Sequence, residues 1–119
     1  MSIESESKTE QEMKAKGLTA PRIPASYIQG LMDRVVVRCH VVEGTTTTVA
    51  VALLDGSFTL STAISACVDP ANFDRDIGER IASGKAMDLA RDKLWELAGF
   101  RAWMDLRDEP NGLTSPVQE

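Results

Sequence analysis

Residues 72–75 carry the combination of side chains that is best suited to holding a nucleotide-like ligand. The amide of Asn72 could read polar edges, the ring of Phe73 could stack on a base, and Asp74 and Arg75 add charge. They follow an Asp-Pro step at the predicted start of a long helix, where unpaired backbone N–H groups attract anions. A structural interpretation stays open, in which Asn72 or Asp74 caps the helix and Phe73 packs in the core.

Two other regions offer partners for a polar or anionic ligand. The threonine run 45–48 includes Thr47, whose hydroxyl could reach such a ligand, although threonine is also favoured simply by β-strands. Arg91 is one of several basic residues on the predicted long helix that could meet phosphate, and each of them also fits a solvated helix face. The candidate ligand-binding residues are therefore Thr47, Asn72, Phe73, Asp74, Arg75 and Arg91.

The sequence offers no catalytic or metal-binding motif. His40 is the single histidine and has no adjacent nucleophile, and its neighbour Cys39 should point to the opposite side of a strand. Cys39, His40 and Cys67 lack the closely spaced ligand pairs of a zinc site. We therefore expect no enzyme activity, no metal and no cofactor. One disulfide could form, but the apolar strand-like surroundings of both cysteines favour free, buried thiols.

The amino-acid composition of the chain argues against some classes of binding partner. The chain has 119 residues, a net charge of −5 and 43% hydrophobic residues, which is enough for one small core. An acidic protein is a poor general nucleic-acid binder, because such binding needs a basic face. No apolar run approaches the roughly 20 residues that span a bilayer. The N-terminus is acidic and does not look like a signal peptide, so we expect a cytoplasmic protein without membrane contact.

Hydrophobic periodicity predicts an α+β fold. A short helix opens at Pro24 or Ser26, and β-rich segments 35–42, 45–54 and 57–66 form a three-stranded antiparallel meander. The pair Asp55-Gly56 is a strong hairpin signal. A long helix over about 72–97 then packs on the sheet and stops near Gly99, and a short C-terminal helix follows around 100–106. The apolar stripe of the long helix is Ala82, Ala86, Leu89, Ala90, Leu94 and Leu97.

The ends of the chain differ in composition from its centre. The polar composition of residues 1–20 predicts a disordered or frayed tail. We expect residues 21–107 to form a single α+β domain and residues 108–119 to form a flexible C-terminal tail.

Several matched blocks, which follow one another in the same order along the chain, carry a family resemblance. They include the segments 20–24, 46–49 and 54–59, the run 65–74, and the run 93–100, which reads Lys-Leu-Trp-Glu-Leu-Ala-Gly-Phe. Residues 20 to about 106 resemble the gene-product-49/gene-66-like family of small phage proteins. Two departures are an extra residue at the hairpin, Ser57, and a span from Gly78 to Trp95 that is about one helical turn longer than in shorter members.

The resemblance implies a function that the residues alone do not. The family is similar to the first type of Thoeris anti-defence proteins, which sequester cyclic ADP-ribose signals without cleaving them and assemble through their long helices. It thus implies a homo-oligomer in the infected host's cytoplasm, holding a cyclic ADP-ribose isomer or cyclic oligonucleotide. The alternatives are a phage accessory protein that inhibits a host protein directly, and a phosphodiesterase that degrades the signal.

Overall fold

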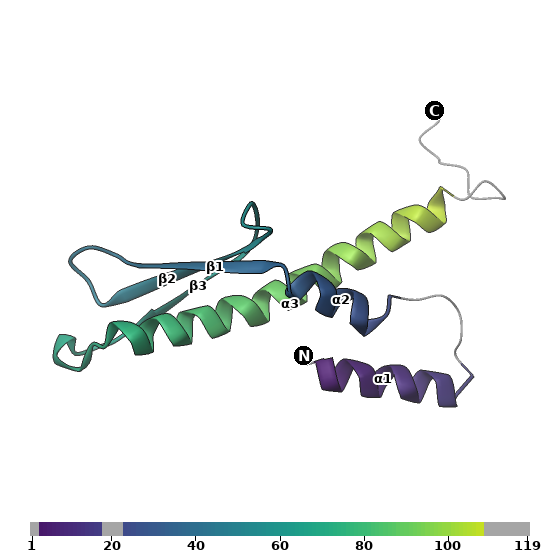
Figure 1. Ribbon diagram of the computed structural model, residues 1–119, viewed down its shortest axis with the longest axis horizontal. Helices are drawn as coiled ribbons and strands as arrows, with labels where there is room; N and C mark the ends of the chain where they lie inside the picture. The colour runs from purple at the N-terminus through teal and green to yellow at the C-terminus, as the bar shows by residue number, and fades with distance from the viewer. Residues whose placement is uncertain (1–2, 18–22, 109–119) are drawn as a thin grey trace.

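The computed structural model describes residues 3–17 and 23–108 (Figure 1). The elements in chain order are helices α1 and α2, strands β1, β2 and β3, a single 3₁₀ turn η1, and helix α3. Their bounds are α1 Ile3–Ala15, α2 Ala25–Met32, β1 Val35–Val41, β2 Thr47–Leu54, β3 Phe58–Ala66, η1 Pro70–Asn72 and α3 Arg75–Arg107. The predicted α+β fold is confirmed: one long helix covers one face of a three-stranded sheet.

The sheet is an antiparallel meander in the order β1-β2-β3. The β2–β3 hairpin turns at Asp55 and Gly56, which both have positive φ, 57° and 72°. Such angles fit the tight turn that the Asp-Gly pair predicted. The register slips between Ala52, which pairs with Ser61, and Leu53, which pairs with Thr59. This bulge turns the buried Leu60 and its neighbour toward α3, where the Ser61 hydroxyl donates to the Ala86 carbonyl at 2.6 Å.

Small residues let α3 lie close to the sheet. Every fourth residue of its first half is glycine or alanine and is buried, which places them on one face of the helix. Alternate residues of the central strand β2 face them, and these are also small. The buried positions are Gly78, Ala82, Ala86 and Ala90 on α3, then Leu94, and Thr48, Ala50 and Ala52 on β2.

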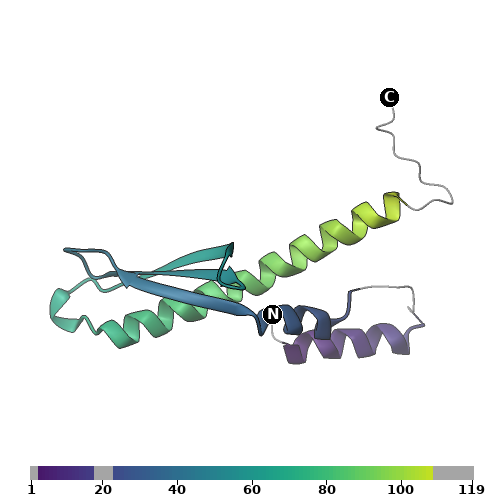
Figure 2. The ribbon, with the colours of Figure 1, turned by 45° about the horizontal axis from the view of Figure 1, so that its top comes forward.

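Helix α3 is longer than expected and runs without a break to Arg107. The predicted stop at Gly99 and the separate helix over 100–106 are therefore wrong in detail. A glycine inside a helix costs about 1 kcal/mol against alanine, which the helix-forming residues on either side can absorb. As a result, the C-terminal part of α3 extends past the sheet (Figures 1 and 2).

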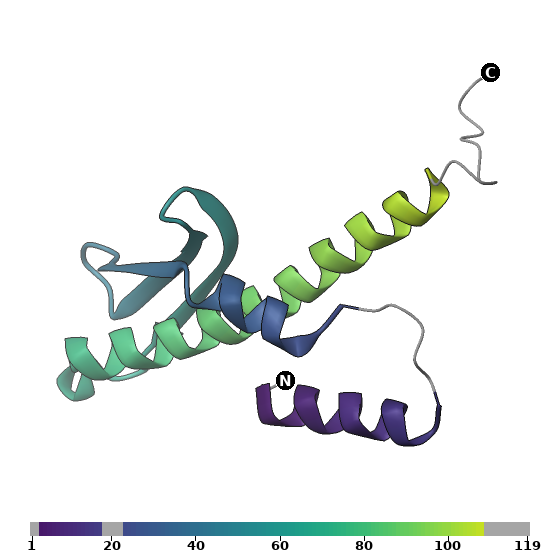
Figure 3. The same cartoon turned by 45° about the vertical axis from the view of Figure 1, so that its right-hand side comes forward.

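The N-terminal segment, expected to be disordered or frayed, contains the 13-residue helix α1. It lies beside α2 rather than on the sheet, as Figures 1 and 3 show. Of the C-terminal tail predicted from residue 108, only Asp108 lies within the described residues.

None of the described helices is both long enough and apolar enough to cross a membrane. Both cysteines are free, as expected, but they are half-buried rather than buried. Cys39 lies on the α3 side of β1 with its Sγ 3.1 Å from Ser83 Oγ, whereas His40 is exposed.

Candidate functional site

The junction between β3 and α3 is built from two successive caps. Asp69 caps η1 by accepting a hydrogen bond from the Ala71 N–H at 2.9 Å. Asp74 then caps α3, because its Oδ1 accepts from the Ile77 N–H at 3.1 Å. The capping interpretation thus holds for Asp74, while the Asn72 side chain is exposed and makes no cap.

The charges at this junction are mixed. Asp74 and Asp76 place two carboxylates at the helix start, where they complement the helix dipole. Arg75 adds a positive charge and pairs with Glu79 through Nε at 3.2 Å, but its side chain is still 67% exposed. An anion that binds here must therefore avoid the two carboxylates and use Arg75 and the remaining N–H groups.

Phe73 is neither a core residue nor free in solvent. It is half-buried, and its ring lies against the first turn of α3. A Cβ atom added to Gly78 would lie 3.8 Å from Phe73 Cε1, which is ordinary van der Waals contact. The ring is therefore held beside the helix backbone, with the exposed Asn72 and Arg75 on either side of it in sequence.

Thr46 and Thr48, the two neighbours of the predicted Thr47, both lie against this region: Thr46 Oγ1 donates to the Cys67 carbonyl at 2.6 Å, and Thr48 packs against Gly78 of α3. Thr48 is fully buried, and a Cβ added to Gly78 would lie only 2.8 Å from its Oγ1. This hydroxyl has no hydrogen-bond partner among the described residues. Thr47 is half-buried, and because side chains alternate along a strand it points to the opposite face of the sheet. The sequence did contain a signal for this orientation. The small residues Ala50 and Ala52 lie two and four positions after Thr48 on the same strand, so all three face the same side of the sheet.

Arg91 does not join the junction within one chain. It lies sixteen residues beyond Arg75 on the same helix, or about 24 Å at roughly 1.5 Å per residue. The predicted site residues therefore occupy three places: the junction (Asn72, Phe73, Asp74 and Arg75), the other face of the sheet (Thr47), and the middle of α3 (Arg91).

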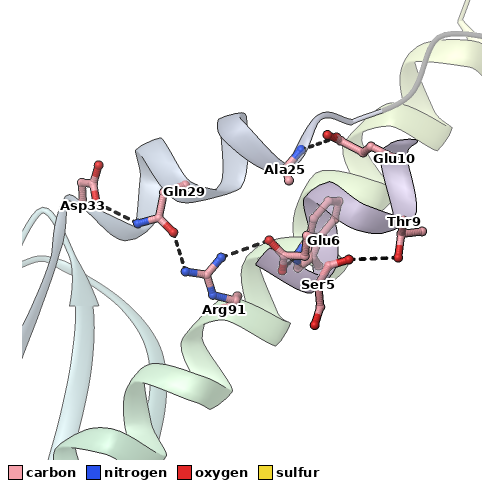
Figure 4. Close-up of polar contacts among 9 residues, drawn as sticks. Ser5, Glu6, Thr9, Glu10, Ala25, Gln29, Asp33 and Arg91 are labelled. Carbon is pink, nitrogen blue, oxygen red and sulfur yellow. Dashed lines mark hydrogen bonds and ion pairs between the residues drawn. The ribbon is translucent and has the colours of Figure 1, made fainter. Parts of the chain in front are cut away.

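Arg91 belongs instead to a polar cluster that ties α1 and α2 to α3 (Figure 4). Its Nη1 donates to Glu6 Oε1 at 3.1 Å, and its Nη2 donates to Gln29 Oε1 at 2.6 Å. The other carboxylate oxygen of Glu6 accepts from Trp95 Nε1 at 2.6 Å. The side chains of Glu6 and Arg91 are only 1% and 14% exposed. We call Gln29, Arg91 and Trp95 the cradle, and Glu6 is its occupant.

Sequence reasoning missed this cluster because its occupant lies in a polar segment. Glu6 is one acidic residue among several in α1, and no local pattern marks it as buried. The one readable signal was on α3, where Arg91 and Trp95 are four residues apart and so share a helix face.

A shallow groove of about 580 Å³ lies elsewhere, between β3 and α3. It does not include the junction or the cradle. Its lining residues are Leu60, Ser61, Thr62, Leu89, Asp92, Lys93 and Glu96.

Comparison with known proteins identifies the family. A family model described as "Phage protein (N4 Gp49/phage Sf6 gene 66) family" matches residues 7–106, which is most of the chain. No curated protein and no solved structure matches. The match includes most of α1, all of the sheet and the junction, and α3 as far as Leu106, so this chain belongs to the Phage protein (N4 Gp49/phage Sf6 gene 66) family.

Proposed function

We propose that this phage protein binds a cyclic nucleotide immune signal at the junction and sequesters it without cleaving it. The signal is a cyclic ADP-ribose isomer or a cyclic oligonucleotide, and the place of action is the cytoplasm of the infected bacterium. The proposal starts from the family's resemblance to Thoeris anti-defence proteins, and its chemistry rests on the half-buried ring of Phe73.

Phe73 is suited to stacking because its ring is half-buried beside α3. One edge of the ring would be in van der Waals contact with a Cβ at Gly78, so this neighbour restricts part of the side-chain freedom that binding would otherwise remove. Stacking of a base on an aromatic side chain contributes about 1–3 kcal/mol. The exposed Asn72 amide can read the polar edge of a base, and the exposed Arg75 can meet a phosphate.

Sequestration requires affinity and enough protein, but not turnover. The described residues around Phe73 include carboxylates that serve as caps, an amide, a guanidinium and the Cys67 thiol, which donates to the Asn72 carbonyl at 3.6 Å, and no nucleophile–base pair is seen among them. This chemistry is that of a binding protein rather than a hydrolase. We therefore propose a non-enzymatic role in which each bound signal is removed from solution.

Isothermal titration calorimetry with cyclic ADP-ribose isomers and cyclic oligonucleotides tests this function. We expect one of them to bind and to be recovered intact when the complex is heated. Phe73→Ala should weaken binding about 5- to 150-fold, which corresponds to the loss of about 1–3 kcal/mol. Phe58→Ala is the matched control, because Phe58 is 56% exposed at the start of β3 and remote from the junction.

Two results would contradict the proposal. If no signal nucleotide binds, and a host protein is captured in stoichiometric amounts that nucleotides do not displace, the alternative of direct host inhibition replaces it. If the nucleotide comes back cleaved with many turnovers per subunit, the protein is a phosphodiesterase.

We also propose that the protein is a homo-oligomer assembled through α3. The part of this helix beyond Leu94 carries exposed apolar side chains that the sheet does not cover. These are Leu97, Phe100, Trp103, Met104 and Leu106. Contiguous exposed apolar surface of this kind is typical of interaction sites.

A further inference from the structure

The cradle has the form of a binding site whose occupant comes from the same chain. Both oxygens of the Glu6 carboxylate are used, one by the Arg91 guanidinium and one by the Trp95 indole N–H. This arrangement is how proteins recognise a planar oxyanion. The donors are four residues apart on α3, so the helix itself aligns them whether or not α1 is present.

The second nitrogen of Arg91 is held from the side of α2. Gln29 accepts from it through Oε1, and the amide orientation of Gln29 is fixed in turn because its Nε2 donates to Asp33 Oδ1 at 2.9 Å. The cradle is therefore pre-organised by the two helices that also pack in the core. The carboxylate of Asp33 contacts the side chain of Gln29, which in turn contacts Arg91.

Helix α1, in contrast, is held to the rest of the molecule by two of its carboxylates. Glu6 is its only buried residue, and no residue of α1 belongs to the hydrophobic core cluster. Glu10 is a second polar anchor of α1, because its Oε2 accepts from the Ala25 N–H at 2.5 Å. Undocking α1 would therefore open the cradle without opening the core.

We propose that Gln29, Arg91 and Trp95 form an oxyanion-binding site that Glu6 fills as a tethered ligand, and that an external monoanion can displace Glu6. One guanidinium matches one negative charge, so the ligand group is a carboxylate or a phosphodiester. Because Glu6 belongs to the same chain as the cradle, its effective concentration there is on the order of millimolar. An external anion binds only if its own concentration and affinity are high enough to compete with Glu6.

The test uses the full chain carrying Trp103→Phe, which leaves Trp95 as the single tryptophan. Glu6→Ala empties the cradle, and Glu12→Ala, on an exposed residue of the same helix, is the control with the same change of charge. Each variant is titrated with acetate and with dimethyl phosphate at constant ionic strength, with chloride as the balancing salt, while Trp95 fluorescence is followed.

We expect a saturable fluorescence change in the Glu6→Ala protein at concentrations about tenfold lower than in the Glu12→Ala protein. A response to acetate identifies a carboxylate site, and a response to dimethyl phosphate identifies a phosphodiester site. Adding Arg91→Gln should abolish either response. The proposal is wrong if neither anion gives a saturable change, or if both single variants respond alike.

A second measurement avoids the risk that Glu6→Ala perturbs folding. In the unmodified protein, the effective anion should speed amide hydrogen exchange of α1 several-fold and leave β2 unchanged. Unchanged exchange in α1 at the highest concentration of both anions would overturn the proposal. Neither measurement involves a cyclic nucleotide, so failure here leaves the proposed function at the junction intact.

Discussion

The contact between Thr48 and Gly78 is a close approach between α3 and the sheet. The Thr48 side chain occupies the space that a Cβ at position 78 would need, with Oγ1 only 2.8 Å away. Thr48 is fully buried, so it has no room to move aside. Gly78→Ala should therefore lower the free energy of unfolding by about 1–3 kcal/mol, the usual cost of overpacking. Urea denaturation followed by circular dichroism measures this change.

Gly84 provides the matched control for this substitution. It lies in the same helix, but a Cβ there would meet no atom within 4 Å. Gly84→Ala should thus stabilise the protein by about 0.5–1 kcal/mol, because alanine is the better helix former. Combining Gly78→Ala with Thr48→Ala should recover part of the loss by making room. Equal stabilities of the two glycine variants would show that the contact is not tight.

The exposed ion pair between Arg34 and Asp55 predicts a dependence of stability on acid pH. Arg34 contacts both carboxylate oxygens, through Nε at 2.9 Å and Nη2 at 2.6 Å. Its hydrogen bond, more than its charge, lowers the pKa of Asp55 below the usual 3.8. A lowered folded-state pKa gives stability that is complete above the unfolded value and is lost as pH falls through the folded one.

Asp55→Asn should abolish that contribution while keeping the turn, since asparagine tolerates the positive φ of this position. The difference in unfolding free energy between the unmodified protein and the variant should be constant above about pH 4 and shrink below it. Urea denaturation at a series of acid pH values measures the difference. A difference that does not change with pH would mean that the ion pair makes no net contribution.

Among the elements, α3 shows most clearly where local signals fail. The sequence around Gly99 reads as a helix end, yet the helix continues for eight residues beyond it. If α3 is continuous, Gly99→Ala should raise the free energy of unfolding by up to about 1 kcal/mol, because the added Cβ meets nothing within 4 Å. If Gly99 instead ended the helix in a left-handed conformation, the same substitution would destabilise the protein. Thermal unfolding distinguishes the two.

The elements that were predictable are those whose signals are local. The Asp55-Gly56 turn and the β-branched strands located the meander, and the buried spacing of Ala82, Ala86 and Ala90 located the face of α3. By contrast, α1 has a polar sequence. Its position depends on the contact between Glu6 and Arg91, two residues that are 85 positions apart in the sequence. No local pattern encodes such a contact.

The residues of the candidate site also differ in how far local sequence rules predict their roles. The capping role of Asp74 followed from helix rules, whereas the choice between Thr47 and Thr48 depended on strand phase. Arg91 looked like one of several solvated basic residues, yet it is mostly buried because two other helices supply its partners. Sequence spacing shows which residues of a helix share a face. It does not show which residues of other elements contact that face, because tertiary packing determines those partners.

At the scale of the whole molecule, the sheet covers only part of α3. Beyond Leu94 the helix carries Phe100 and Trp103, which are 60% and 50% exposed. Their rings stack with centroids 6.3 Å apart, and the Arg107 guanidinium lies 4.8 Å from the Trp103 ring centroid. A small domain buries a limited fraction of its surface, so covering these rings with a second copy would add stability.

Analytical ultracentrifugation over a range of concentrations tests that assembly. We expect a species larger than the 13.0 kDa chain, and Trp103→Glu should shift it toward the monomer, since a charge buried in an apolar interface is costly. Phe58→Glu is the control, because Phe58 is exposed to a similar extent, 56% against 50% for Trp103, but lies on β3, so the substitution should leave assembly unchanged. Circular dichroism verifies that both variants keep their helix content. A monomeric unmodified protein at every concentration, or equal dissociation by both variants, would place the assembly surface elsewhere and leave the exposed rings for a host protein to bind.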